Sequence, residues 1–366
     1  MLDRGRIGIH QLIVLVILVT IGDSILVLPS VIVAEAKQDA WISMIIGVAA
    51  GLTIAYLFCK VGALYPRLTL VQYNDKILGK WLGIVFSLLF LLYFLLNIGL
   101  MVREIGDFMT TQIMPETPIE AILILMLSIV IMGARLGLEP IARAGETFFV
   151  WFILLFFMLV LFLSPEVDTE KMTPILAEGF QPVLAGALPV MAFPFTELLV
   201  FLMIFPFVHE PKRMAKSFLF GAAMGGTVLT VIVVLALLVL GPDLTARNIY
   251  ASYSLAKQIS VGDFIERIEA ILAIMWLLTM YFKITLYYYA SHLGLAQLLK
   301  LRDYRMLLLP MGVNIVVLAI VISPNISYYN LVISRYWPLY DITIGIIMPL
   351  LLLAVGTVRR GEHRSG

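Results

Sequence analysis

The chain has 366 residues, 61% of them hydrophobic and only 13% charged, and its mean hydropathy is +1.02. These values are typical of polytopic membrane proteins and exclude a soluble globular protein. A net charge of +1 gives no indication of a nucleic-acid partner. The single cysteine, Cys59, excludes an internal disulfide and a cysteine-based metal site. No Ser-His-Asp, Walker or Gly-rich phosphate pattern occurs, so we expect no enzyme and neither a cofactor nor a metal.

Apolar segments of membrane-spanning length follow one another along the whole chain. A hydrocarbon core about 30 Å thick needs roughly 20 apolar residues per helix. The sequence predicts ten such spans, which form a single all-α transmembrane domain over residues 1–366 embedded in the lipid bilayer. They cover residues 10–34, 39–63, 82–112, 118–136, 146–164, 186–208, 217–240, 263–292, 305–323 and 338–358.

Lysine and arginine residues concentrate on one side of the predicted spans. They lie in the N-terminal segment, in the loops after even-numbered spans and in the C-terminal segment; Arg67, Lys80, Arg143, Arg213 and Arg302 are examples. Positive charge marks the cytoplasmic side, so we expect both termini in the cytoplasm. On the outer side, the aromatic loop 323–337 is typical of side chains at the lipid headgroups.

The first and the sixth spans are interrupted in the middle. Gly22, Asp23 and Ser24 break the first apolar run, and Pro194 and the Thr-Glu pair at 196–197 break the sixth. Such residues at bilayer depth are costly unless the unwound backbone lines a cavity or binding site. Matched breaks five spans apart indicate a transporter fold of two inverted halves, about 9–164 and 186–358. The alternative is a pair of ordinary proline kinks.

The two breaks predict a ligand site near the bilayer midplane. A restarting helix offers free N–H groups to a carboxylate, and a stopping helix offers carbonyls to an ammonium or cation. A zwitterionic amino acid fits both ends. Tyr93 and Asn97 share one face of the third span and are further candidates for lining the cavity. The candidate ligand-binding residues are Gly22, Asp23, Ser24, Ile25, Tyr93, Asn97, Phe193, Phe195, Thr196 and Glu197.

Three further groups of charged residues lie within or near the spans. Asp23, Glu197 and Lys283 are candidates for ion or proton coupling; the alternative for Lys283 is that its ammonium snorkels to the cytoplasmic headgroups. Arg103, Glu104 and Asp341 are candidates for an outer gate closed by ion pairs; the alternative is that a vestibule solvates them. The same candidate gate includes Asp107 beside Glu104, and Glu266, Arg267 and Glu269 at the outer end of the eighth span.

Two segments of the chain resemble a known family. Gln11, the apolar run that follows it, Ile21-Gly22 and the Leu26–Pro29 segment, with YPRLTLVQYNDKILGKWLG at 65–83, resemble the B subunits of bacterial endospore germinant receptors (GerAB-type germination permeases). The resemblance implies the amino acid–polyamine–organocation superfamily and a LeuT-like five-plus-five inverted repeat. It also implies a spore inner-membrane subunit that recognises nutrient germinants, commonly amino acids, beside A and C subunits. The implied span 8 packs against span 1, where the Lys283 ammonium would replace the cation of sodium-coupled relatives.

Asp23 departs from the pattern of related amino acid transporters, whose span 1 break consists of small neutral residues. An ionised Asp23 would repel a substrate carboxylate, so it is protonated, pairs with a ligand amine or a cation, or points away. Three functions remain open: a ligand-sensing subunit, a proton-coupled amino acid transporter, and a scaffold that keeps only the fold. Two buried ionisable residues in unwound helix disfavour the scaffold.

Overall fold

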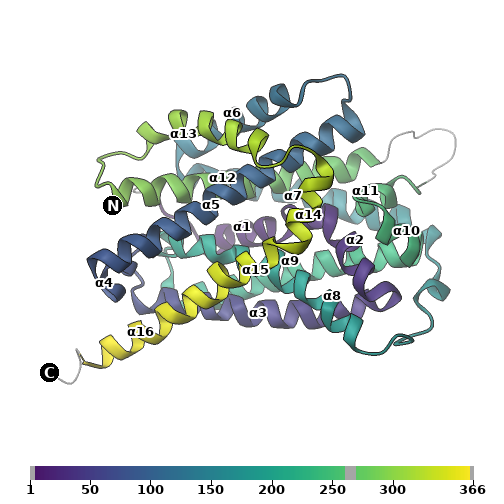
Figure 1. Ribbon diagram of the computed structural model, residues 1–366, viewed down its shortest axis with the longest axis horizontal. Helices are drawn as coiled ribbons and strands as arrows, with labels where there is room; N and C mark the ends of the chain where they lie inside the picture. Colours follow the sequence, from purple (N-terminus) through teal and green to yellow (C-terminus); the bar gives the residue numbers. More distant parts are fainter. Residues whose placement is uncertain (1–4, 260–268, 363–366) are drawn as a thin grey trace.

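The computed structural model describes residues 5–259 and 269–362, in which the regular structure is helical apart from one isolated bridge between Ile7 and Val208. The long helices run lengthwise through one elongated bundle (Figure 1). The chain enters α1 (Ile9–Ile21) and leaves α16 (Met348–Glu362) at the same end of the bundle. The short helices α10 (Pro242–Arg247) and α11 (Ala251–Ala256) lie at the opposite end.

The first predicted span is broken as expected. Helix α1 ends at Ile21, Gly22 adopts φ 28° and ψ −124°, and α2 (Ser24–Ala36) begins one residue after Asp23. Only glycine adopts a positive φ without strain, which places the break at this residue. Pro29 lies inside α2 and does not end it.

The sixth predicted span is broken over a longer stretch than expected. Helix α8 (Gln181–Met191) passes into a π-helical turn, η5 (Ala192–Thr196), and then into the 3₁₀ segments η6 (Glu197–Met203) and η7 (Phe205–Phe207). No α-helix resumes within this span. Pro194 and Pro206 lack an N–H group for the α-helical hydrogen-bond ladder, which accounts for the change of helix type.

The remaining elements complete the bundle. In the first half they are α3 (Ala40–Leu64), α4 (Leu70–Leu78), α5 (Lys80–Phe108), η2 (Met109–Ile113), α6 (Ile119–Leu136) and α7 (Leu138–Leu163). In the second half they are α9 (Pro211–Leu240), α12 (Glu269–Leu298), α13 (Arg305–Val321), α14 (Ile326–Arg335), α15 (Trp337–Ile342) and η9 (Thr343–Ile347). Short 3₁₀ turns occupy Lys37–Asp39, Ser164–Glu166 and Thr169–Met172. Residues 263–268 of the predicted eighth span lie outside the described part.

The described residues contain eight helices that are long and apolar enough to cross a membrane, or nine if one bent pair counts as a span. This count does not confirm ten spans. Helix α1 has only 13 residues, and α2 and α3 count together as one segment, Ser24–Leu64. The bent pair is α13 with α14, at an angle of 97°. The number of ten membrane spans therefore stays a prediction. The assignment of the chain as an integral membrane protein does not depend on this number.

Helix α12 occupies the centre of the bundle and α7 its periphery. Of their most apolar windows, 67% is buried for α12 and 17% for α7. Helix α12 packs against α1, α5, α6 and α7. Helix α2 packs against α8, α10 and α11. A charged side chain in the middle of α12 is therefore enclosed by other helices rather than by lipid.

The aromatic residues of loop 323–337 divide between the surface and the interior. Tyr328 and Tyr336 are 45% and 58% exposed, as a headgroup belt requires, but Tyr329 and Trp337 are each only 7% exposed. The prediction of an aromatic belt is therefore wrong for these two. The sharp bend between α13 and α14 turns α14 across the bundle and carries Tyr329 inward.

Candidate functional site

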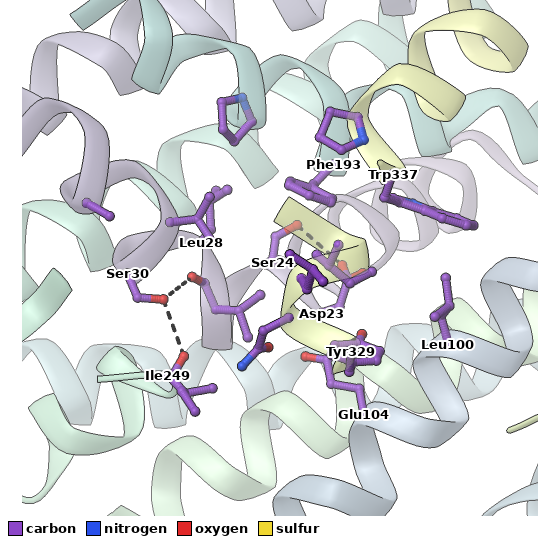
Figure 2. A pocket seen from close by; sticks show the side chains of 18 of the residues that line it. Asp23, Ser24, Leu28, Ser30, Leu100, Glu104, Phe193, Ile249, Tyr329 and Trp337 are labelled. Carbon is purple, nitrogen blue, oxygen red and sulfur yellow. Dashed lines mark hydrogen bonds between the residues drawn. The ribbon is translucent and has the colours of Figure 1, made fainter. Parts of the chain in front are cut away.

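A cavity of about 610 Å³ lies between the two breaks. Its deep end is formed by Asp23 and Glu197, and its wall includes residues of α2, α5, α8, α10, α14 and α15 (Figure 2). It reaches Glu35 and Arg247, which are both exposed. The cavity therefore connects the two breaks in the middle of the bundle with one end of the molecule.

The backbone at the first break is stabilised by side chains from other elements. Unwinding at Gly22 removes the α-helical partners of nearby carbonyls, and such groups need new donors inside a membrane protein. Thr279 Oγ1 donates to the Gly22 carbonyl at 3.1 Å, and Ser252 Oγ donates to the Ile25 carbonyl at 2.6 Å. These two hydrogen bonds fix the unwound turn on the cavity wall, where Ser24 faces the cavity.

The second break is held in a similar way. The Tyr287 hydroxyl of α12 donates to the Glu197 carbonyl at 2.6 Å, and Thr196 Oγ1 donates to the Ala192 carbonyl. Phe193 lines the cavity, whereas Phe195 packs into the core beside Gly51 and Gly226. Thr196 is buried beneath the cavity wall and does not line it.

One lysine joins the two breaks. Lys283 Nζ lies 2.6 Å from Asp23 Oδ1 and also forms an ion pair with Glu197 Oε2. Its side chain is fully buried in the middle of α12, so the snorkelling alternative is wrong. The reason is the central position of this helix, which leaves the ammonium no path to the headgroups. Asp23 therefore points to an internal cation and keeps 15% of its side chain exposed on the cavity side.

The absence of a side chain at Gly22 allows this approach. A Cβ atom built on Gly22 would lie 3.0 Å from Lys283 Nζ and collide with Lys283 Cδ. The same glycine therefore supplies both the positive φ of the break and the space for the lysine. In the sequence, only the implied packing of spans 8 and 1 indicates that Lys283 lies beside the first break.

Of the two candidates on the third span, Asn97 lines the cavity as expected, but Tyr93 does not. The Tyr93 hydroxyl donates to Asp341 Oδ1 at 2.8 Å, and the Tyr93 ring stacks on Trp337 at 6.3 Å between centroids. Trp337 lines the cavity, so Tyr93 supports the wall from behind. Asn97 lines the cavity while its amide nitrogen donates to the Tyr93 carbonyl at 3.0 Å.

The predicted outer-gate residues on α5, and Asp341 on α15, are buried. Arg103 Nε donates to Asp107 Oδ2 at 3.0 Å along α5, and Glu104 Oε2 accepts from the Tyr329 hydroxyl at 3.3 Å. Arg103, Glu104 and Asp341 are at most 7% exposed, so the solvated-vestibule alternative is wrong for them. Among the described residues of the predicted gate, the ion pair that forms is that of Arg103 with Asp107, and it lies within α5 and does not join two helices. Glu266 and Arg267 lie outside the described residues.

The end of the bundle opposite the cavity mouth is held closed by the chain itself. Ile7 N donates to the Phe207 carbonyl, and His209 N donates to the Ile7 carbonyl, both at 3.0 Å. These bonds join the segment before α1 directly to the end of η7. The two broken spans are therefore fastened together at one end and separated by the cavity towards the other.

The sequence of this helical protein matches one family along most of its length. The family model described as spore germination protein matches residues 6–327. The chain belongs to the spore germination protein family. It is 32% identical over 329 residues to spore germination protein KB of Bacillus subtilis (strain 168), covering 89% of this chain and 87% of that protein. It is 25% identical over 299 residues to spore germination protein YndE of the same organism, covering 81% and 82%.

Solved structures confirm the fold of this family member. The structure of MhsT in complex with L-phenylalanine matches with a TM-score of 0.71 at 12% identity, covering 96% of this chain and 99% of that one. The nucleobase-cation-symport transporter Mhp1 with bound bromovinylhydantoin matches with a TM-score of 0.66 at 13% identity, covering 95% and 78%. Both are LeuT-fold transporters, so the predicted LeuT-like architecture with broken first and sixth spans is confirmed.

Half of the predicted ligand-binding residues reach the cavity. Those that line it are Asp23, Ser24, Asn97, Phe193 and Glu197; those that do not are Gly22, Ile25, Tyr93, Phe195 and Thr196. Sequence reasoning missed Tyr329 and Trp337 as wall residues and assigned Glu104 to a gate. The spacing of Glu104 could have indicated its position on the wall. Asn97, Met101 and Glu104 follow one another at helical spacing, so they share one face of α5.

The two phenylalanines of the second break offer a test of this wall. Phe193→Ala is expected to change ligand affinity and to lower the stability less than the same change at Phe195, because part of its ring borders the cavity. Phe195→Ala is expected to lower the free energy of unfolding by about 3–5 kcal/mol, because it removes a core ring. Thermal unfolding in detergent beside a binding assay separates the two effects. Equal loss of stability in both variants would contradict this assignment of Phe193.

Proposed function

We propose that this chain recognises a small nutrient germinant, an amino acid, in the cavity between its two breaks. The observation that carries this proposal is the cavity itself. Its volume of about 610 Å³ is within the range of small-molecule sites. It runs from Asp23 and Glu197 to one exposed end, and the opposite end is fastened through Ile7.

The family supplies the biological setting of this proposal. Relatives named as spore germination proteins match most of the chain, which supports a role in germination and a location in the spore inner membrane. The resemblance to germinant-receptor B subunits adds A and C subunits as partners. The subunit would change its packing against them when the ligand binds one conformation better than another.

The orientation and the repeat boundaries belong to the same proposal. The start of α1 and the end of α16 lie at one end of the bundle, and the lysine and arginine distribution would assign that end to the cytoplasm. The cavity then opens to the outer side. The two inverted repeats would cover about 9–164 and 186–358 within one transmembrane domain.

A second function has one observation in its favour. Asp23, Glu197 and Lys283 form a buried ionisable cluster at the junction of the two breaks, the place where a transporter would couple a proton to its substrate. The alternative is therefore a proton-coupled amino acid transporter of the same fold.

Binding and uptake measured together distinguish these functions. The purified chain in proteoliposomes is incubated with each of a panel of tritiated amino acids, with and without a proton gradient. We expect saturable binding of a subset of the panel and no accumulation above protein-free liposomes. Gradient-driven accumulation would replace the receptor by the transporter, and the absence of binding to any amino acid would contradict both.

A further inference from the structure

The inner part of the cavity contains more acidic than basic groups. Asp23, Glu104 and Glu197 line it, and the ammonium of Lys283 is shared between Asp23 and Glu197. Lys283 itself does not line the cavity, and among the described lining residues the cationic one, Arg247, lies at the exposed end. Both ion pairs of Lys283 go to Asp23 and Glu197, and within the described residues no ion pair joins Glu104 to a cation.

Glu104 also has an unused hydrogen-bond acceptor. Its Oε2 accepts from the Tyr329 hydroxyl at 3.3 Å, but its Oε1 has no hydrogen-bond partner among the described residues. The residue is 2% exposed, so bulk water does not satisfy this oxygen. Figure 2 shows Glu104 and Tyr329 together on the cavity wall, opposite Phe193. Buried acceptors of this kind normally have a partner.

We propose that Glu104 binds the ammonium group of the ligand and so restricts the site to amines. This inference rests on the function proposed above and deepens it, because it names the ammonium group as the part of the ligand that the site recognises. Because Glu104 lines the cavity, a small rotation of its carboxylate would bring the unpartnered oxygen to a charged N–H donor there, and the two would form a charge-assisted hydrogen bond. Asn97 and Met101, on the same face of α5, would then border the carbon chain of the ligand.

The assignment also explains why a carboxylate at this position is compatible with an amino acid ligand. Glu104 belongs to α5, whereas Ser24 begins α2, where the N–H groups of a restarting helix favour a ligand carboxylate. Glu104 would thus bind the ammonium group of a zwitterion, and the backbone N–H groups at the start of α2 would bind its carboxylate. Compounds that lack the amino group would leave the Glu104 oxygen unpaired and bind more weakly.

The test compares Glu104→Gln with Asp107→Asn in the purified full chain. Asp107 is a buried carboxylate on the same helix, but it pairs with Arg103 and does not line the cavity. Binding is measured for tritiated L-alanine, L-leucine and L-phenylalanine, with propanoate, 4-methylpentanoate, 3-phenylpropanoate and n-butylamine as competitors. Thermal unfolding in detergent shows whether each variant is folded.

For Glu104→Gln we expect the affinity for amino acids to fall about 10- to 100-fold, the range for losing a hydrogen bond to a charged group. Competition by n-butylamine should disappear, and competition by the carboxylic acids should be unchanged. Asp107→Asn should keep the amino acid affinity of the unmodified chain. Glu104→Asp, which keeps the charge, should show a smaller loss and serves if the glutamine variant is unfolded.

Unchanged amino acid affinity in Glu104→Gln would overturn the assignment while leaving the proposed function in place. So would an equal loss for amines and carboxylic acids, because that pattern indicates damage to the cavity as a whole. Failure of the unmodified chain to bind any amino acid would instead overturn the proposed function, and this inference with it.

Discussion

Lys283→Met is expected to abolish ligand binding and to destabilise the protein strongly. The change removes the ammonium that contacts both Asp23 and Glu197 and leaves two carboxylates in a buried site without a cation. Removing one partner of a buried ion pair typically lowers the free energy of unfolding by roughly 3–5 kcal/mol. Thermal unfolding in detergent and amino acid binding in proteoliposomes measure the two effects.

Two further variants make this prediction specific. Lys212→Met, at the exposed start of α9, changes the same side chain and should leave stability and binding unaltered. Combining Lys283→Met with Asp23→Asn and Glu197→Gln removes the unpaired charges and should recover most of the lost stability without restoring binding. Normal stability and binding in Lys283→Met alone would show that the lysine does not connect the two breaks.

Gly22→Val is expected to abolish ligand binding while leaving membrane insertion intact. The residue adopts φ 28° and ψ −124°, a backbone conformation that residues with a side chain rarely adopt, so valine would be strained there. Its Cβ would in addition collide with Lys283 and displace the ammonium from Asp23. Both effects act on the deep end of the cavity. Expression, detergent extraction and amino acid binding of the variant are the measurements.

Gly79→Ala separates the collision from the backbone strain. Gly79 also has a positive φ, 82°, but a Cβ added there would meet nothing within 4 Å. This variant should lose some stability and keep normal affinity. If Gly22→Val bound the ligand normally, the first break would not belong to the site.

The breaks themselves could be predicted from the sequence because glycine, proline and carboxylates stand out inside apolar runs. The partners of these residues could not. Lys283 lies 260 positions after Asp23, and no local sequence pattern predicts the contact between their side chains. The family resemblance indicated the packing of the two spans but left snorkelling open, because burial depends on how central α12 is in the bundle.

The cavity wall was less predictable than the breaks for a related reason. The aromatic composition of loop 323–337 is the same whether its rings face headgroups or a cavity, and the bend before α14 decides between them for Tyr329. Tyr93 and Phe195 are polar or aromatic residues near the breaks, as a ligand site requires. Tyr93 instead stacks on Trp337, and Phe195 packs beside Gly51 and Gly226, so only packing distinguishes these positions from cavity-lining ones.

Protection of a single engineered cysteine tests most directly whether the ligand occupies this cavity. The one natural cysteine, Cys59, is replaced by alanine, and Val27→Cys is introduced on the cavity wall. The rate of alkylation by N-ethylmaleimide is then measured with and without the amino acid that binds best, beside Lys212→Cys as a control outside the cavity. We expect the ligand to slow alkylation at position 27 in a saturable way and to leave position 212 unchanged. Equal alkylation rates at position 27 with and without a bound ligand would place the ligand elsewhere and contradict the central claim.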